Sequence, residues 1–111
     1  MKKHLFVRAA GALFLAGAAA PIRAESARSE NFEIHCVVCH GENGKGQTEE
    51  GRKKKARDLT NAKWQETIDD ARIVRSITKG HDEMPAFGKK LTEAEIKALA
   101  AEVRNLAKKS S

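Results

Sequence analysis

The sequence has few of the residues from which a small domain usually builds a core or a cross-linked scaffold. Its 111 residues include no tyrosine, one tryptophan and two cysteines, and aromatic residues make up only 5% of the chain. Cysteine could therefore supply one disulfide at most, which cannot make up for a small core. A domain of this size with so few large apolar side chains usually needs a metal or a cofactor in its middle.

The sequence also lacks an apolar run long enough to cross a membrane. The run from Ala9 to Ala20 has about 12 residues, whereas a membrane-spanning helix needs roughly 20. Three basic residues come before it: Lys2, Lys3 and Arg8. A plausible cleavage position follows at Ala24, which completes the order of a secretory signal peptide. We expect residues 1–24 to be cleaved and residues 25–111 to be periplasmic and soluble, without stable membrane insertion; an uncleaved anchor is the alternative.

The positive charge of the chain gives little support for a nucleic-acid partner. The whole chain has a net charge of +6 and a pI near 9.6, but four of its basic residues lie within residues 1–24. The remainder has 17 basic and 15 acidic residues, so its charge is nearly balanced. We therefore expect no binding to nucleic acid, which usually requires a strongly basic domain.

Strand patterns are nearly absent, and the chain is predicted to be all-α. Apolar periodicity and end signals predict three helices, over residues 28–38, 66–80 and 91–109. The last is the clearest, since Thr92 and Glu95 form a capping box at its start. Four glycines predict a loop over residues 41–52, and a second loop surrounds Pro85.

Both cysteines lie in one short motif, Cys36-Val-Val-Cys39-His40. A disulfide between them would close a very small loop, which stabilises little, and would leave His40 unexplained. A structural zinc ion needs a second pair of ligands, and a thioredoxin-like dithiol needs a βαβ context; this sequence has neither. The motif is the signature of c-type haem attachment, with Cys36 and Cys39 forming thioethers and His40 ligating the iron.

A haem iron that carries electrons needs a second axial ligand, and Met84 is the leading candidate. It is the only methionine besides Met1, and it precedes Pro85 in the second predicted loop. A thioether is a soft ligand that raises the reduction potential. His81 is the rival ligand, and His35 is interpreted as a surface histidine. The expected cofactor is one covalent haem c with its iron between His40 and Met84.

Three motifs carry a resemblance to a known family: Phe32-x-x-x-Cys36-x-x-Cys39-His40-Gly41, Ile77-x-x-Gly80 and Met84-Pro85-Ala86-Phe87. With the capped final helix, the pattern resembles a small bacterial class I c-type cytochrome, monohaem and His/Met ligated, over most of residues 28–108. The resemblance implies a cytochrome c domain over residues 25–111. It also implies the class I fold, in which about four helices wrap around one covalently attached haem.

The resemblance suggests further haem contacts. The segment Ala56–Thr60 resembles the one that passes the proximal histidine, with Leu59 touching the haem. Trp64 would donate its indole N–H to a haem propionate, with plain core packing as the alternative. Many relatives have a proline where this chain has Arg57, and the proline carbonyl accepts the Nδ1–H of the haem histidine. Arg57 keeps a carbonyl that could do the same.

One pair of departures from the family pattern suggests an ion pair. Relatives usually have a glycine before the first helix and an aromatic residue at the facing position of the last helix. This chain has Arg28 and Glu102 there. We hypothesise that the two form a salt bridge in place of the usual contact; two unrelated surface residues are the alternative.

The predicted function is one-electron transport in the periplasm rather than catalysis. The alternatives are an electron-transfer subunit of a larger dehydrogenase or reductase, and a haem enzyme or sensor with a labile sixth ligand. The expected partners are redox proteins with acidic docking surfaces. They would meet a basic rim made of Lys45, residues 52–57, Lys89 and Lys90.

Overall fold

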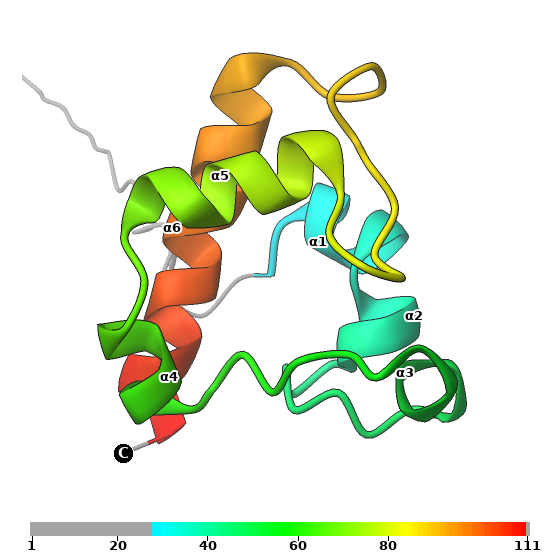
Figure 1. Ribbon diagram of the computed structural model, residues 1–111, viewed down its shortest axis with the longest axis vertical. Helices are drawn as coiled ribbons and strands as arrows, with labels where there is room; N and C mark the ends of the chain where they lie inside the picture. Colours follow the sequence, from blue (N-terminus) through cyan, green and yellow to red (C-terminus); the bar gives the residue numbers. More distant parts are fainter. Residues whose placement is uncertain (1–27, 111) are drawn as a thin grey trace, which may run out of the picture.

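The computed structural model describes residues 28–110, and regular structure in this part is helical. Its six helices are α1 (Glu30–His35), α2 (Val37–His40), α3 (Glu49–Lys54), α4 (Ala62–Glu66), α5 (Asp70–Lys79) and α6 (Glu93–Ser110) (Figure 1). The one β pairing in the described part is an isolated bridge between His81 and Met84. The all-α prediction is confirmed, with six helical segments in place of about four. The predicted signal peptide, residues 1–24, lies outside the described residues.

Side-chain caps fix where most of these helices begin. Ser29, Thr48, Asn61 and Asp69 each accept a hydrogen bond from a backbone N–H in the first turn of α1, α3, α4 and α5. The capping box predicted for α6 is confirmed. The Thr92 N–H donates to Glu95 Oε1 at 2.8 Å, and the Glu95 N–H donates to Thr92 Oγ1 at 3.1 Å.

The loop predicted for residues 41–52 is wrong over its last four residues, which belong to α3. Thr48 caps this helix, and Glu49 and Glu50 lie in its first turn, where acids are favourable. Gly51 does not mark a turn. A Cβ atom at Gly51 would lie 2.1 Å from the backbone oxygen of Cys39, so the residue allows α3 to pack directly against α2.

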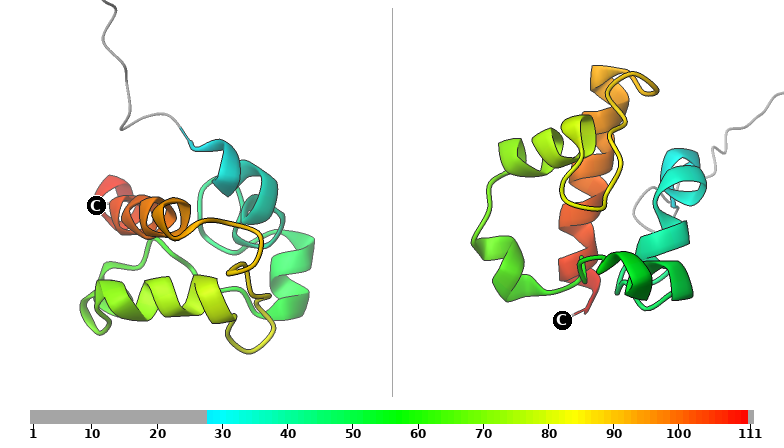
Figure 2. Two further views of the ribbon diagram at one scale, coloured as in Figure 1. Left: turned by 90° about the horizontal axis from the view of Figure 1, so that it is seen from above. Right: turned by 45° about the vertical axis from the view of Figure 1, so that its right-hand side comes forward.

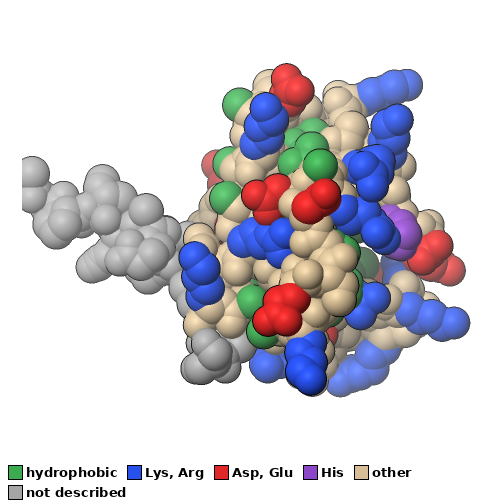
Figure 3. Space-filling model, turned by 60° about the vertical axis from the view of Figure 1, so that its left-hand side comes forward, with side chains coloured by type: hydrophobic (Ala, Val, Ile, Leu, Met, Phe, Trp, Pro, Cys, Tyr) green, Lys and Arg blue, Asp and Glu red, His purple; other side chains and the backbone are tan. Residues whose placement is uncertain are grey.

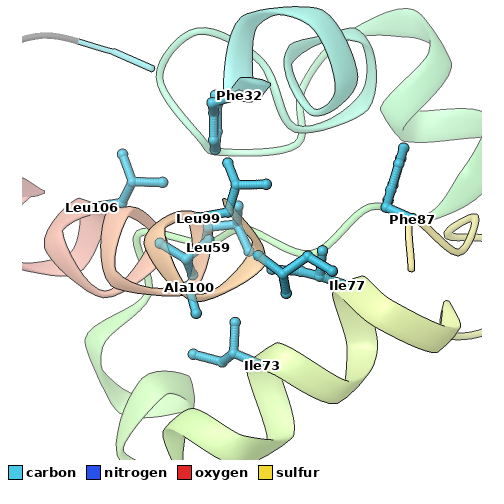
Figure 4. Close-up of a cluster of buried hydrophobic side chains, with 10 residues drawn as sticks. Phe32, Leu59, Ile73, Ile77, Phe87, Leu99, Ala100 and Leu106 are labelled. Carbon is cyan, nitrogen blue, oxygen red and sulfur yellow. The ribbon is translucent and has the colours of Figure 1, made fainter. Parts of the chain in front are cut away.

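The core lies where α6 crosses the other helices. α6 contacts α1, α4 and α5, and the right-hand view of Figure 2 shows it between α4 and α5 on one side and the first three helices on the other. The predicted stripe on α6 is buried: Ile96, Leu99, Val103 and Leu106. Phe32 is fully buried and points from α1 toward Leu99 (Figure 4). This contact lies at the crossing of the first and last helices.

Within residues 28–110, none of the helices is both long enough and apolar enough to cross a membrane.

Candidate functional site

Two adjoining cavities, of about 130 Å³ and about 390 Å³, lie between the first three helices and the rest of the domain. The residues that line both are Cys36, His40, Arg57, His81 and Met84. Leu59 and Trp64 line the smaller cavity, and Cys39 lines the larger one. The structure therefore brings all six predicted site residues to one continuous space.

The break between α1 and α2 forms one wall of this space. Cys36 lies at the break, and Cys39 and His40 follow on the single turn of α2. The two cysteines are not joined by a disulfide. His40 Nδ1 lies 3.0 Å from the backbone oxygen of Arg57, so Nδ1 carries the ring proton and donates a hydrogen bond to this carbonyl. The bond leaves Nε2 as the ring nitrogen free to bind a metal.

Burial is the main cause of the pKa shifts of Cys36, Cys39 and His40. It raises the pKa of the Cys36 thiol to about 11, with a further contribution from the Glu102 carboxylate. Burial also raises the pKa of Cys39, and it lowers the pKa of His40 against the opposing effect of the Arg57 carbonyl. The cysteines are thus neutral thiols, which are poor redox nucleophiles, and His40 is the neutral imidazole that a metal requires.

A tight turn after α5 places Met84 at the same space. The His81 N–H donates to the Met84 oxygen at 3.1 Å, and the Met84 N–H donates to the His81 oxygen at 2.8 Å. Gly80 has a φ of 82°, and a Cβ atom there would lie 2.7 Å from the Met84 oxygen. The Phe87 N–H donates to the Ile77 oxygen at 2.9 Å, which ties the loop to α5. Met84 is therefore held at a set position.

His81, the rival ligand, shares this turn but is less enclosed. Its side chain is 53% exposed, and Nε2 lies 3.4 Å from Asp82 Oδ2. Met84 is half-buried. The geometry therefore favours Met84.

The sequence suggested that His35 is a surface residue, but the structure places it otherwise. It is half-buried and lines the larger cavity, with its ring centroid 5.2 Å from that of Phe87. The sequence pattern alone did not reveal this contact, because Phe87 belongs to the distant loop after α5.

Apolar and cationic side chains complete the smaller cavity. Leu59 is buried, and its N–H donates to the Gly44 oxygen at 2.7 Å. Trp64 is half-buried on α4, and the guanidinium carbon of Arg57 lies 4.9 Å from its ring centroid. Arg72 and Ser76 also line this cavity and were not predicted. Their i, i+4 spacing beside Ile73 and Ile77 is the signal that could have placed them on the cavity side of α5.

The site fits a porphyrin held by this motif. Two neutral thiols and an imidazole lie on one side, a thioether lies on the loop after α5, and apolar walls lie between them. Residues 28–110 contain no group of three or more His, Cys, Asp or Glu side chains that could hold a metal ion without a cofactor. The residues present match iron that arrives within a macrocycle.

The helical fold and this set of side chains define a small c-type cytochrome of class I. The chain belongs to the family described as cytochrome c oxidase, cbb3-type, subunit III, whose model matches residues 24–101. It therefore carries a covalently bound c-type haem with iron and has an electron-transfer role.

The relatives differ from this chain in length. The FixP subunit of the cbb3-type cytochrome c oxidase from Azorhizobium caulinodans is 44% identical over 79 residues, which are 70% of this chain and 26% of FixP. The CcoP subunit from Azospirillum brasilense is 40% identical over 76 residues, which are 68% of this chain and 26% of CcoP. The chain spans about a quarter of the length of these curated relatives.

A solved structure is similar over nearly its whole length. The KustC0563 c-type cytochrome is 38% identical with a TM-score of 0.65, and the match covers 69% of this chain and 93% of that one. The family predicted from the sequence motifs is thereby confirmed.

Proposed function

We propose that this protein moves single electrons through a haem attached to Cys36 and Cys39, with the iron ligated by His40 and Met84. The observation that carries the proposal is the shared space lined by Cys36, His40 and Met84, beside the bond from His40 Nδ1 to the Arg57 carbonyl. When bound, the haem supplies a reversible one-electron couple.

The protein's own residues would keep rearrangement small during electron transfer. The Arg57 carbonyl fixes the ring orientation of His40, and the paired backbone bonds between His81 and Met84 fix the loop that carries the thioether. Apolar side chains such as Leu59 and Ile77 exclude water from the smaller cavity. With His40 and Met84 both bound to the iron, no position would be left open for a substrate. This argues against a haem enzyme or a sensor with a labile sixth ligand.

We further propose that the chain works as the electron-transfer subunit of a larger respiratory complex, and that residues 1–24 direct its export to the periplasm and are then removed. Its similarity to the FixP and CcoP subunits supports this assignment. A free periplasmic carrier is the second candidate, because the match to KustC0563 covers 93% of that small cytochrome. Affinity purification of the tagged holoprotein from detergent-solubilised whole cells separates the two. Co-purification of a stable haem-containing assembly supports the subunit, and recovery of the cytochrome alone supports the carrier.

We propose that redox partners dock at the larger cavity. Its rim includes Lys54, Lys55 and Arg57, together with three acids: Glu50, Asp82 and Glu83. Lys54 Nζ lies 3.7 Å from Glu50 Oε2, so part of this charge is already paired. Both signs are also interspersed on the face drawn in Figure 3. Attraction to acidic partners would therefore come from the local rim, and rates of electron exchange should fall as ionic strength rises. Rates that do not change with salt would contradict this docking mode.

Expression with a haem-attachment system tests the central proposal. The expected holoprotein has the mass of one covalent haem, a low-spin spectrum and the weak near-infrared band of a sulfur–iron bond. The reduced protein should not respond to carbon monoxide. A chain without covalent haem would overturn the proposal, and a spectrum without the sulfur–iron band would overturn the role of Met84.

A further inference from the structure

A half-buried ion pair lies next to the wall of the smaller cavity. Arg28 and Glu102 form this pair, and their side chains are only 24% and 19% exposed. The Arg28 guanidinium carbon lies 4.5 Å from the centroid of the Phe32 ring. Phe32 and Cys36 both line the smaller cavity. The Phe32 side chain therefore contacts the guanidinium and the cavity at once.

Glu102 reaches the same wall from α6. Its neighbours on this helix, Leu99 and Val103, line the smaller cavity. One carboxylate oxygen accepts a hydrogen bond from the Ser29 backbone N–H, and the other accepts one from the Ser29 hydroxyl. Because both oxygens are held, the negative charge has a set position beside the cavity wall.

The stability of the helix crossing does not account for this pair. Arg28 Nη2 donates to the Glu42 backbone oxygen, but Nη1 is buried and has no hydrogen-bond partner within residues 28–110. A buried donor without a partner costs free energy. An apolar contact in the same place would avoid this cost, since half-buried charges often stabilise no better than apolar side chains. The charges are more readily explained by an effect on the adjoining site.

Both charges act on the point of haem attachment. Burial is the main cause of the raised pKa of Cys36; among charged groups, the Glu102 carboxylate raises this pKa and the Arg28 guanidinium lowers it, with the carboxylate having the larger effect. Partly buried charges are screened by solvent and salt much less than exposed ones. The same opposing effects should therefore reach an iron bound beside Cys36.

We propose that Glu102 and Arg28 set the reduction potential of the haem, with Glu102 lowering the potential and Arg28 raising it. The inference rests on the proposed attachment through Cys36. Reduction adds one negative charge at the iron, which a nearby carboxylate disfavours and a nearby guanidinium favours. The pair as a whole lowers the potential, because the carboxylate acts more strongly at Cys36 than the guanidinium does.

The test uses the haem-loaded full chain with E102Q, R28Q, R28K and the double variant of R28Q with E102Q. E102Q removes the charge but keeps an amide oxygen that can accept a bond from Ser29. R28K keeps the positive charge. K97Q and E93Q are the matched controls, since each removes one exposed charge from α6 and neither residue lines a cavity. The readouts are the midpoint potential and the near-infrared sulfur–iron band, whose retention shows that the axial ligands are unchanged.

We expect reduction to be favoured by up to about tenfold in E102Q, which corresponds to about 59 mV for one electron, and disfavoured by a smaller factor in R28Q. The double variant should lie between these two, and R28K and both controls should stay close to wild type. Opposite signs identify charge as the cause, because a loosened crossing would admit water and lower the potential in both single variants.

Two results would overturn this inference alone: a potential that falls in both E102Q and R28Q, or potentials like those of the controls in both variants when they are loaded with haem. A wild-type chain without covalent haem would overturn the proposed function and this inference with it.

Discussion

Arg28 and Glu102 form an ion pair in which Arg28 Nε lies 3.7 Å from Glu102 Oε2. The pair joins the segment just before α1 to the middle of α6, and it confirms the salt bridge predicted from the sequence. The same carboxylate accepts hydrogen bonds from the Ser29 backbone N–H at 3.1 Å and from the Ser29 hydroxyl at 2.7 Å. The Arg28 guanidinium carbon lies 4.5 Å from the centroid of the Phe32 ring. A polar cluster thus lies beside the contact between α1 and α6.

Replacing Glu102 should loosen this crossing. We expect E102A to lower the free energy of unfolding by about 1–3 kcal/mol, because it removes the ion pair and both bonds from Ser29. Urea denaturation of the holoprotein measures the loss. A double-mutant cycle with R28A should assign no more than about 1 kcal/mol to the ion pair itself. An E102A protein as stable as wild type would show that the cluster contributes nothing.

Gln65 should contribute strongly to the stability of the fold although its side chain is polar. Its Nε2 donates to the backbone oxygens of Leu59 and Val103, both at 2.8 Å, and the side chain is buried. Q65L leaves both carbonyls without this donor and should cost about 2–3 kcal/mol of stability. Q47L is the matched control, because Gln47 is exposed. Equal unfolding midpoints for Q65L and Q47L would contradict this account.

The start of α6 should weaken in acid. The N–H of Thr92 holds the pKa of Glu95 below its ordinary value. The stabilisation by the Glu95 carboxylate is therefore fully present above the pKa that Glu95 has in the unfolded chain. It is lost as the pH falls through the lower pKa that Glu95 has in the folded protein. E95Q should be less stable than wild type at neutral pH, and the difference should shrink at about pH 3. E93Q controls for charge in the same turn; a gap for E95Q that stays constant with pH would refute the prediction.

Met84 should control the spectrum and the potential of the haem. In M84A the near-infrared sulfur–iron band should disappear, and the midpoint potential should fall because a thioether favours ferrous iron. E66A changes an exposed acid that lines neither cavity and should leave both unchanged. H81A should also keep the sulfur–iron band. Loss of the band in H81A and its retention in M84A would assign the axial position to His81 instead.

The residues that carry the chemistry of the site could be predicted from the sequence better than the packing that surrounds them. Cys36, Cys39 and His40 lie within five consecutive residues, and Met84 is one of only two methionines, so residue type and spacing indicated them. The long α6 was predictable because its apolar stripe repeats over several turns.

The short helices and the packing around the cavity were not predictable in this way. The helix α4 has five residues, too few to show a period. It is held by Gln65, whose partner Val103 lies 38 positions further along the chain. His35 was misplaced for the same reason, since its neighbour Phe87 comes from another part of the fold. Contacts between distant segments leave no local pattern.

The close packing at Gly51 has a consequence for how partners would find the haem. Because a Cβ atom there would lie 2.1 Å from the Cys39 oxygen, α3 and the attachment motif are packed together as one unit. The basic residues of α3, such as Lys53 and Lys54, therefore keep a set distance from the point of haem attachment. Under the proposed function, a partner that recognises these charges is also brought to a defined electron-tunnelling distance. A single hydrogen atom, the side chain of Gly51, preserves that alignment.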